Sequence, residues 1–557
     1  MNGLGGQVCS SYIRWEIYHP LSITINHHHY LYALDTVLIQ MDLWFVILAS
    51  LSVAFLLKSL RDLVFPSTSD RRTKPLPPGP TRYPIIRTFQ WLRRSFSEIE
   101  PMLRKLRSVH GPLITLRIGP NPSIFVASHA LAHQALVQNG AVFSDRPKPL
   151  PTTRIVSSNQ RNISSAAYGP TWRLLRRNLT SEILHPSRVK AYSGARKWVL
   201  GILLERLRGD CGSGSGVKLI DHFQYAMFCL LVLMCFGDKL EEAKIKEIEK
   251  VQRRLLLGFR RFNILNFFPR IGRFIFPDRW RELIGTREEQ ERIFVPLIHA
   301  RAQSRSREED DDGVVAYVDT LRNLELPEEK RNLNDGEMVS LVSEFLSAGT
   351  DTTSTALQWI MANLVKHPTI QEKLYGEISS VKGPPPGEIN VAAVEEEDLA
   401  EMRYLKAVVL EGLRRHPPGH FVLPHAVTEE TELNGYTIPK NATVNFMVAE
   451  MGLDPNVWED PTEFKPERFL TAAGDDGGEM FDVTGRREIK MMPFGSGRRM
   501  CPGWGLALLH LEYFVANLVW YFEWREAEGE KVNLEEKPEF TVVMKYPLRA
   551  KLRLRSS

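Results

Sequence analysis

Residues 493–505 read PFGSGRRMCPGWG, and an apolar helical pattern from Leu506 to Trp520 follows them. Cys501 lies just before that helix, where the helix dipole favours a thiolate, and the adjacent Arg498 and Arg499 should favour it further. Cys501 is therefore a candidate metal ligand. A glycine-rich loop before a helix can instead bind phosphate, but neither G-x-x-x-x-G-K-[ST] nor G-x-G-x-x-G is complete here. A small buried cysteine at a tight turn is the remaining structural alternative.

A second motif interrupts a long helical pattern over residues 335–366. The pattern begins with an N-x-x-E capping box at 334–337, and its apolar residues recur with helical spacing. In its middle, AGTDTT (348–353) brings together a glycine and three β-branched threonines, which lower helix propensity. The threonine hydroxyls could simply bond back to preceding carbonyls. Alternatively, small residues let a flat ligand approach the backbone, and Asp351 with Thr352 can relay protons.

The third motif is an acid–base pair on a helix predicted from about Asp398 to Arg415. Glu411 and Arg414 are three residues apart, which places them on one helix face. Such a pair is common and weak when it is exposed. Arg468, further along the chain, could complete a buried cluster with it.

The rest of the composition favours a large intracellular protein. The chain has 557 residues, 43% of them hydrophobic, and five cysteines with no C-x-x-C, which argues against a disulfide framework or a zinc finger. Its net charge of +5 is too small and dispersed to favour nucleic acid as a partner. Helical periodicity at 197–207, 222–236 and 240–262, with a hairpin signal at 111–127, predicts a mainly α fold with a smaller β part.

The amino-terminal region predicts a membrane anchor. Residues 43–57 (LWFVILASLSVAFLL) carry no charge and are near the lower limit for a membrane span. Positive charge follows the run, which places the remaining chain on the cytosolic side; a cleaved signal peptide is the alternative. We therefore predict an extra segment 1–40 upstream of the true start at Met41, an anchor at 41–65, a Pro-rich hinge at 66–80 and a catalytic domain at 81–557.

Together these motifs resemble the haem-thiolate monooxygenases of the cytochrome P-450 family, and in particular its plant microsomal A-type members. Residues 494–503 match the F-x-x-G-x-R-x-C-x-G haem loop at every fixed position. The E-x-x-R pair with Arg468, and the A-G-x-D-T-T run at 348–353, match in the family's chain order. The resemblance runs from about Met41 to the end and implies the cytochrome P-450 fold behind a single transmembrane anchor.

The resemblance also implies a cofactor and its ligands. Haem b would be held by the axial thiolate of Cys501, and Asp351 with Thr352 would deliver protons during oxygen activation. Glu411, Arg414 and Arg468 would form a buried structural triad. His425 falls where many family members carry arginine, so its contact with the haem would be weaker or dependent on pH. The cofactor-binding residues implied beside Cys501 are Arg499, Trp172, Arg176, His425, Phe494, Gly497 and Gly503.

The function implied is insertion of one oxygen atom of O₂ into a lipophilic small molecule. Electrons would come from NADPH through NADPH-cytochrome P-450 reductase, at the endoplasmic reticulum membrane, with the catalytic domain in the cytosol. The Asp351–Thr352 pair favours this reaction over a haem-thiolate isomerase or dehydratase, which typically lacks the pair, and over a non-enzymic haem sensor. By family position, residues 152–163, 421–423 and 540–544 would line the substrate pocket; they suit a hydrophobic plant metabolite and do not identify it.

Overall fold

The computed structural model describes residues 45–59, 74–80, 96–117, 121–210, 216–267, 271–305, 314–386, 393–470 and 481–555. It divides into two compact units, Met1–Thr73 and Lys74–Ser557. In the first unit, Phe45–Ser59 is an apolar helix with exposed side chains, so a helix does occupy part of the predicted anchor. The predicted segment 1–40 and hinge residues 66–73 lie outside the described residues.

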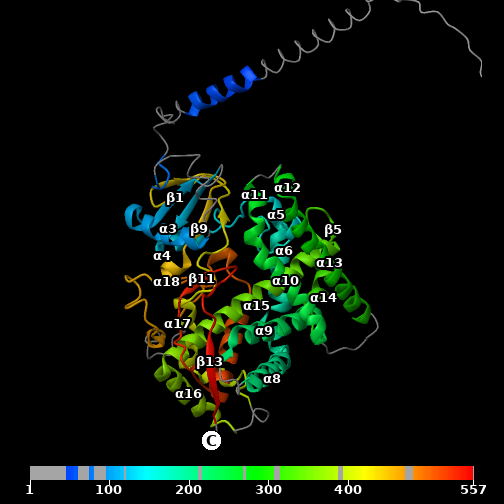
Figure 1. The fold of residues 1–557 in the computed structure, drawn as a ribbon, viewed down its shortest axis with the longest axis vertical. Helices are drawn as coiled ribbons and strands as arrows, with labels where there is room; N and C mark the ends of the chain where they lie inside the picture. The colour runs from blue at the N-terminus through cyan, green and yellow to red at the C-terminus, as the bar shows by residue number, and fades with distance from the viewer. Residues whose placement is uncertain are drawn as a thin grey trace, which may run out of the picture. The chain divides into compact units, whose positions relative to one another are not determined.

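The second unit is mainly helical, as predicted (Figure 1). Its helices and helical turns are α3 Phe96–His110, α4 His129–His133, η1 Gln134–Gln138, α5 Pro151–Val156, α6 Pro170–Asn178, η2 Leu179–Ile183, α7 Pro186–Ala191, α8 Ser193–Asp210, α9 Leu219–Phe236, α10 Glu242–Phe262, α11 Ile264–Phe267, α12 Gly272–Ile275, α13 Pro277–Arg305, α14 Tyr317–Leu321, α15 Asp335–Lys366, α16 Pro368–Lys382, η3 Asp398–Glu401, α17 Arg403–Arg415, α18 Val448–Gly452, η4 Pro466–Phe469, η5 Gly497–Arg499 and α19 Trp504–Tyr521.

The strands form a smaller β part. They are β1 Leu113–Arg117, β2 Pro122–Val126, β3 Val217–Lys218, β4 Glu325–Leu326, β5 Arg331–Asn332, β6 His425–Ala426, β7 Thr431–Leu433, β8 Tyr436–Ile438, β9 Thr443–Phe446, β10 Phe522–Glu526, β11 Glu536–Pro538, β12 Val542–Met544 and β13 Arg549–Leu554. The largest sheet has the order β1-β2-β9-β6, and a second has the order β10-β13-β3. The predicted hairpin is the antiparallel pair β1–β2.

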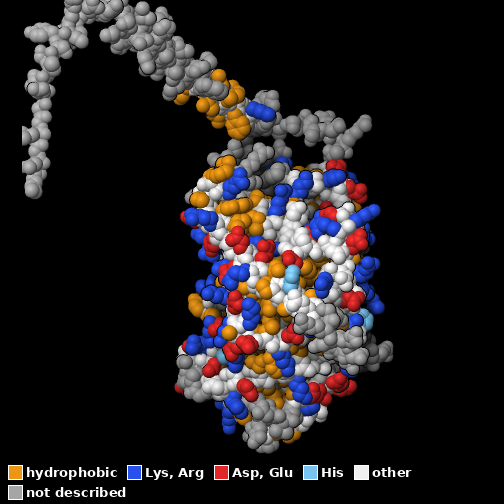
Figure 2. All heavy atoms as spheres, turned by 90° about the vertical axis from the view of Figure 1, so that its right-hand side faces the viewer, with side chains coloured by type: hydrophobic (Ala, Val, Ile, Leu, Met, Phe, Trp, Pro, Cys, Tyr) orange, Lys and Arg blue, Asp and Glu red, His pale blue; other side chains and the backbone are white. Residues whose placement is uncertain are grey.

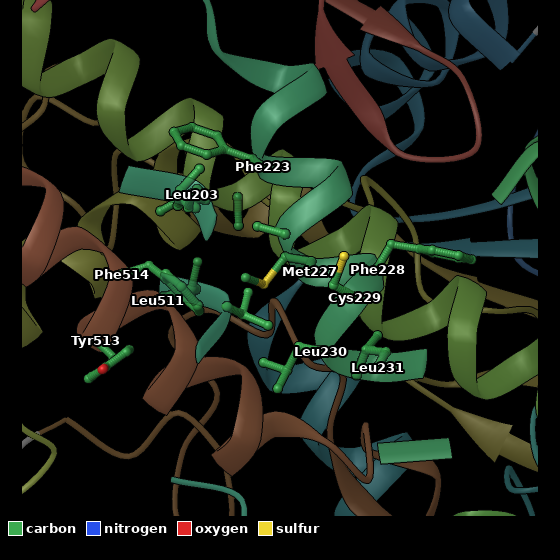
Figure 3. Close-up of a cluster of buried hydrophobic side chains, with 14 of the residues drawn as sticks. Leu203, Phe223, Met227, Phe228, Cys229, Leu230, Leu231, Leu511, Tyr513 and Phe514 are labelled. Carbon is green, nitrogen blue, oxygen red and sulfur yellow. The ribbon is translucent and has the colours of Figure 1, made fainter. Parts of the chain in front are cut away.

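The core forms around α15, which has the bounds that the sequence predicts. Asn334 and Glu337 exchange the two capping hydrogen bonds, both at 2.9 Å, and the helix ends before Pro368. It packs against α9 and α19 and runs through the middle of the unit in Figure 1. Helix α9 is apolar enough to cross a membrane, but 83% of it is buried and it belongs to this core. Figure 3 shows its side chains meeting Leu203 of α8 and Leu511 of α19.

Helix α17 differs from the prediction. Instead of one helix from Asp398, a 3₁₀ turn (η3) ends before Met402, and α17 begins at Arg403. The Glu377 carboxylate of α16 accepts hydrogen bonds from the backbone N–H groups of Tyr404 (2.6 Å) and Leu405 (2.8 Å). The start of α17 is therefore capped by another helix, which sequence spacing does not reveal.

The outer face carries charges of both signs. Figure 2 shows lysine, arginine, aspartate and glutamate side chains interspersed with apolar ones over the face it draws. Charged side chains mixed with apolar ones are typical of a solvated protein surface.

Candidate functional site

Cys501 lies between η5 and α19. Its N–H donates to the carbonyl of Phe494 at 2.8 Å, and its half-buried thiol is free. Phe494 packs at the edge of the core, which holds the loop in place. Burial raises the pKa of the Cys501 thiol, while the Gly503 N–H and the positive charge of Arg176 act to lower it. The loop therefore supplies a thiol whose thiolate already has a hydrogen-bond donor and a nearby cation.

The cation near Cys501 is not one of its two predicted neighbours. The Arg499 guanidinium donates to three carbonyl oxygens, those of Ser144 (2.8 Å), Ile163 (3.3 Å) and Ala166 (2.6 Å). Arg498 donates to the Tyr168 hydroxyl. Both side chains are hydrogen-bonded to segments that precede α5 and α6. The predicted help of Arg498 and Arg499 to the thiolate was therefore wrong, and Arg176 of α6 takes that place.

Arg176 and Cys501 border one cavity of about 350 Å³. Burial lowers the pKa of Arg176, and the charge of Cys501 acts to raise it. One turn before it on α6, the indole N–H of Trp172 is buried and has no acceptor among the described residues. The Arg499 guanidinium lies 4.4 Å above the Trp172 ring. Two donors on one face of α6 are thus available for an anionic group, with Arg499 beside them.

The two glycines predicted in the cysteine loop, Gly497 and Gly503, lie in different surroundings. At Gly497, φ is +71°, and a Cβ atom would lie 2.0 Å from the carbonyl oxygen of Leu136, so the protein itself requires glycine there. At Gly503 no described atom lies within 4 Å of where a Cβ would be. The protein therefore leaves open space beside the backbone at Gly503.

His425 is buried and neutral. Its Nδ1–H donates to the carbonyl of Phe143 at 2.6 Å, since a carbonyl can only accept. Burial and the positive charge of Arg146 lower its pKa to about 3, and Arg499 contributes in the same direction. Its Nε2 is consequently an acceptor, and would have to be protonated before it could bind a carboxylate.

The AGTDTT turn contains the exposed part of the central helix α15. Ala348 is the one exposed residue between Asp335 and Val365, and Thr352 is half-buried beside it. The Thr352 hydroxyl bonds back to the Ala348 carbonyl at 2.6 Å. Gly349 has a packing reason, because a Cβ there would lie 2.5 Å from Cδ1 of Leu231 on α9. The helix thus exposes one turn, and its glycine lets α9 pack closely.

Asp351 borders a second, much smaller cavity. This cavity of about 10 Å³, between α9, α10 and α15, has room for about one water. Asp351 lies 3.6 Å from the guanidinium of Arg253. Burial raises the pKa of Asp351 to about 6, Arg253 opposes this rise, and Glu249 adds to it. Near neutral pH the carboxyl can therefore both hold and release a proton.

Glu411, Arg414 and Arg468 come together as expected. Two nitrogens of Arg414 donate to the Glu411 carboxylate at 2.7 and 2.9 Å, and both side chains are fully buried. Nε of Arg468 donates to Glu411 at 3.2 Å. The cluster joins α17 to η4. Arg468 is 57 residues from Glu411 in the chain, so sequence spacing alone could not show their contact.

Comparison with known proteins identifies the fold and the family. Residues 77–553 match the family model for cytochrome P450. The chain belongs to the cytochrome P450 family. It is similar to cytochrome P450 89A9 of Arabidopsis thaliana, with 51% identity over 91% of this chain and 98% of that one. It is 32% identical to salviol synthase of Salvia pomifera, over 84% of this chain and 90% of that protein.

Other relatives and solved structures agree with this assignment. Flavonoid 3'-monooxygenase of Arabidopsis thaliana is 29% identical over 90% of this chain and 96% of its own length. A zebra fish cytochrome P450 with abiraterone has a TM-score of 0.65 at 21% identity and covers 82% of this chain and 100% of its own, which shows the fold. The chain is therefore an oxidoreductase of the cytochrome P450 class that incorporates oxygen, and the family binds haem through a cysteine thiolate.

The described residues fit a haem. A free cysteine, the unpartnered indole N–H of Trp172 and the Arg176 guanidinium supply an axial thiolate and donors for propionate carboxylates. The open space at Gly503 and the exposed Ala348 turn leave room for a flat group. The protein's own described residues leave this thiol free, these donors without an acceptor and this space open, and a haem would engage all three.

One residue of this region was missed from the sequence. Arg146 donates to the carbonyl oxygens of Ser164 (2.7 Å), Leu423 (2.8 Å) and Pro424 (2.8 Å), and so ties the segment before α6 to the strand β6 region. Burial and the positive charge of Arg499 lower its pKa to about 9. Its only sequence signal is a single arginine before Pro147, which is too general to have found it.

Two of the three segments expected around the substrate, residues 421–423 and 540–544, have mixed environments. Phe421 is half-buried and packs edge-on against Phe125, with ring centres 6.2 Å apart, at the edge of a core cluster. Leu423 is 55% exposed. Phe540 is also exposed and stacks against Phe259 of α10 at 6.5 Å.

Proposed function

We propose that this chain is a haem-thiolate monooxygenase that inserts one oxygen atom of O₂ into a lipophilic small molecule, with electrons from NADPH supplied by NADPH-cytochrome P-450 reductase. The observation that carries the proposal is one cavity bordered by a free cysteine before α19 and an arginine of α6. The plant monooxygenase and hydroxylase relatives support the same reaction class.

Haem b is the cofactor we assign to this cavity. Cys501 would be its axial ligand, and Arg176 and the indole N–H of Trp172 would bind its propionates. Arg499, with three of its five N–H donors already bonded, would contribute its remaining donors. When bound, the haem supplies the activation of O₂ and the oxidation of substrate.

Asp351 and Thr352 would handle the protons. With its pKa near 6, the Asp351 carboxyl can take up a proton from a water in the small cavity and pass it on. The hydrogen of the Thr352 hydroxyl is engaged by Ala348, so its lone pairs are what remain to orient a proton-donating water. An acid and a hydroxyl that can deliver protons favour a monooxygenase over a haem-thiolate isomerase or dehydratase, and over a haem sensor.

Membrane attachment belongs to the same proposal. The apolar helix Phe45–Ser59 would lie within a single-pass anchor in the endoplasmic reticulum membrane, with the catalytic unit in the cytosol. Residues 66–80 would serve as the hinge between them, and residues 1–40 would lie upstream of the true start.

The ligand assignment is tested by optical spectroscopy. The reduced protein with carbon monoxide should show the red-shifted Soret band of thiolate ligation, and Cys501→Ala should abolish it. Cys229→Ala, which changes a buried core cysteine of α9, is the matched control and should retain the band. A Cys501→Ala protein that keeps the band would overturn the assignment.

A further inference from the structure

His420 lies between two carboxylates from distant parts of the chain. Its Nδ1 is 2.6 Å from Oε2 of Glu100 on α3, and its Nε2 is 3.5 Å from Oε2 of Glu536 on β11. The imidazole is buried, and both carboxylates are largely shielded from solvent. The other carboxylate oxygen of Glu536 is 3.0 Å from Nδ1 of His416.

This geometry favours a positively charged His420 ring. Nδ1 is hydrogen-bonded to Glu100, and Nε2 lies at ion-pair distance from Glu536, so both carboxylates stabilise the protonated imidazole. Burial lowers the pKa of His420, but the hydrogen bond and negative charge of Glu100, with Glu536, outweigh it and leave the pKa raised. His416 differs: burial lowers its pKa to about 4, and it donates to Glu536 as a neutral ring.

Other charged groups around His420 are mostly balanced. Arg104 of α3 opposes protonation of His420, but it is itself bound to Glu100 (3.2 Å) and to Glu450 of α18 (2.6 Å). Arg415 of α17 interacts with Glu536 through its charge. The imidazole therefore lies in a network of acidic and basic groups, in which histidine is the residue type whose ordinary pKa is nearest to neutrality.

The network holds two segments that, by the family resemblance, line the substrate pocket of the proposed monooxygenase. His420 directly precedes residues 421–423, and its carbonyl accepts from the N–H of Val448 at 2.8 Å. Glu536 opens the β11–β12 hairpin that carries residues 540–544. The two segments are also joined directly, because the N–H of Val542 donates to the carbonyl of Pro418 at 2.8 Å.

We propose that protonated His420 is a positioning residue, which holds segment 421–423 and the β11–β12 hairpin against α3 and releases them when it loses its charge. The assignment of these segments to the substrate pocket rests on the proposed function; the ionic link itself does not. The change that releases the segments is the loss of a single proton from one ring nitrogen of His420 to solvent. A loosened pair of segments would widen the pocket's tolerance for bulky ligands.

The sign of the pH dependence follows from the raised pKa. A base whose pKa is higher in the folded protein stabilises the fold below its ordinary pKa of 6.5, and that contribution is lost as pH rises through the folded pKa. The link should therefore be closed at pH 6 and should open as pH rises through the raised pKa of His420. Glu536, whose pKa is lowered because its histidine contacts outweigh burial, remains ionised throughout this range.

Hydrogen exchange of the full-length protein tests the link without any substrate. After correction for intrinsic exchange rates, peptides containing the Val448 and Val542 amides should lose protection between pH 6 and pH 9. The loss should be about tenfold for each unit by which the pKa of His420 is raised. His420→Gln should show the unprotected level at every pH. His420→Lys, which keeps a charge to a higher pH, should remain protected at pH 9.

A matched control and a ligand readout complete the test. His299→Gln removes an exposed histidine that is 3.1 Å from Asp335 on α15, and it should leave both peptides unchanged. Binding of clotrimazole, a bulky azole, should depend on pH in the wild type but not in His420→Gln, while imidazole binding should not differ between them. Protection that is independent of pH in the wild type, or unchanged in His420→Gln, would overturn the link. If the carbon monoxide spectrum fails while protection follows pH, the haem assignment is wrong and the link stands.

Discussion

The hydroxyl of Thr352 donates a 2.6 Å hydrogen bond to the carbonyl of Ala348, one turn earlier on α15. Ala348 is the one exposed residue between Asp335 and Val365, so this bond lies on the exposed turn in the middle of α15. Thr352 can therefore both bond back to a preceding carbonyl and take part in proton delivery. The back-bonded hydroxyl is fixed in direction, and its acceptor side is available to a water.

We expect Thr352→Ala to separate electron use from product formation. Removing the hydroxyl removes the acceptor that orients the proton-donating water, so haem binding should persist while NADPH is diverted to peroxide. The measurement is the ratio of peroxide to NADPH consumed in the reconstituted enzyme. Ser181→Ala removes a hydroxyl that also bonds back four residues, to the Arg177 carbonyl on an exposed surface, and should leave the ratio unchanged. Unchanged coupling in Thr352→Ala would count against the relay.

Asp351→Asn should stabilise the fold in a pH-dependent way. The pKa of Asp351 rises from 3.8 to about 6 on burial, so its ionised form is a cost that sets in above pH 3.8 and is complete above about pH 6. The variant's advantage in Tm should grow over that range and then stay level. It corresponds to about 3 kcal/mol at most, at about 1.4 kcal/mol per pKa unit.

Asp482→Asn provides a control of opposite sign for the same Tm series. Burial acts to raise the pKa of Asp482, but hydrogen bonds from the hydroxyl and N–H of Thr484 outweigh it and leave the pKa lowered. This carboxylate therefore stabilises the fold above its ordinary pKa, and its replacement should lower Tm at neutral pH. A Tm difference for Asp351→Asn that is constant from pH 4 to pH 7 would show that the carboxyl is not buried as described.

The two loop glycines should respond differently to alanine. Gly497→Ala drives a Cβ into the Leu136 carbonyl at a positive φ, so the variant should misfold or melt far below the wild type. In Gly503→Ala the added Cβ meets no described atom, so the free energy of unfolding should stay within about 1 kcal/mol of the wild-type value. If haem occupies the space beside Gly503, that variant should nevertheless lose haem several-fold. Haem-to-protein ratios and circular dichroism melting measure both effects; full haem content in Gly503→Ala would exclude a close approach there.

Arg414→Ala should destabilise the unit strongly. It leaves the fully buried Glu411 carboxylate without its bidentate partner, which costs about 3–5 kcal/mol. Lys197→Ala, which breaks an exposed ion pair with Glu395 at 2.8 Å, should cost less than about 1 kcal/mol. Denaturant unfolding of both variants gives the comparison, and equal losses would mean that burial of the Glu411–Arg414 pair contributes nothing.

Local signals predicted α15 well and α17 less well. The bounds of α15 follow from a capping box at one end and a proline at the other, both within a few residues of the helix. The start of α17 depends on Glu377, which lies on another helix. An end that is capped by a neighbouring residue can be predicted from spacing, whereas an end capped across the fold cannot.

The same distinction applies to the site. Local sequence was enough to find the cysteine loop, the AGTDTT turn and the E-x-x-R pair, because each is a run of residues whose chemistry depends on short spacing. Tertiary structure alone decided that Arg176 faces Cys501 while Arg499 turns to three carbonyl oxygens more than 300 residues away in the chain. It also decided that His420 meets Glu100 and Glu536. These contacts depend on how the helices and strands pack, and electrostatic interactions act through space without regard to chain distance.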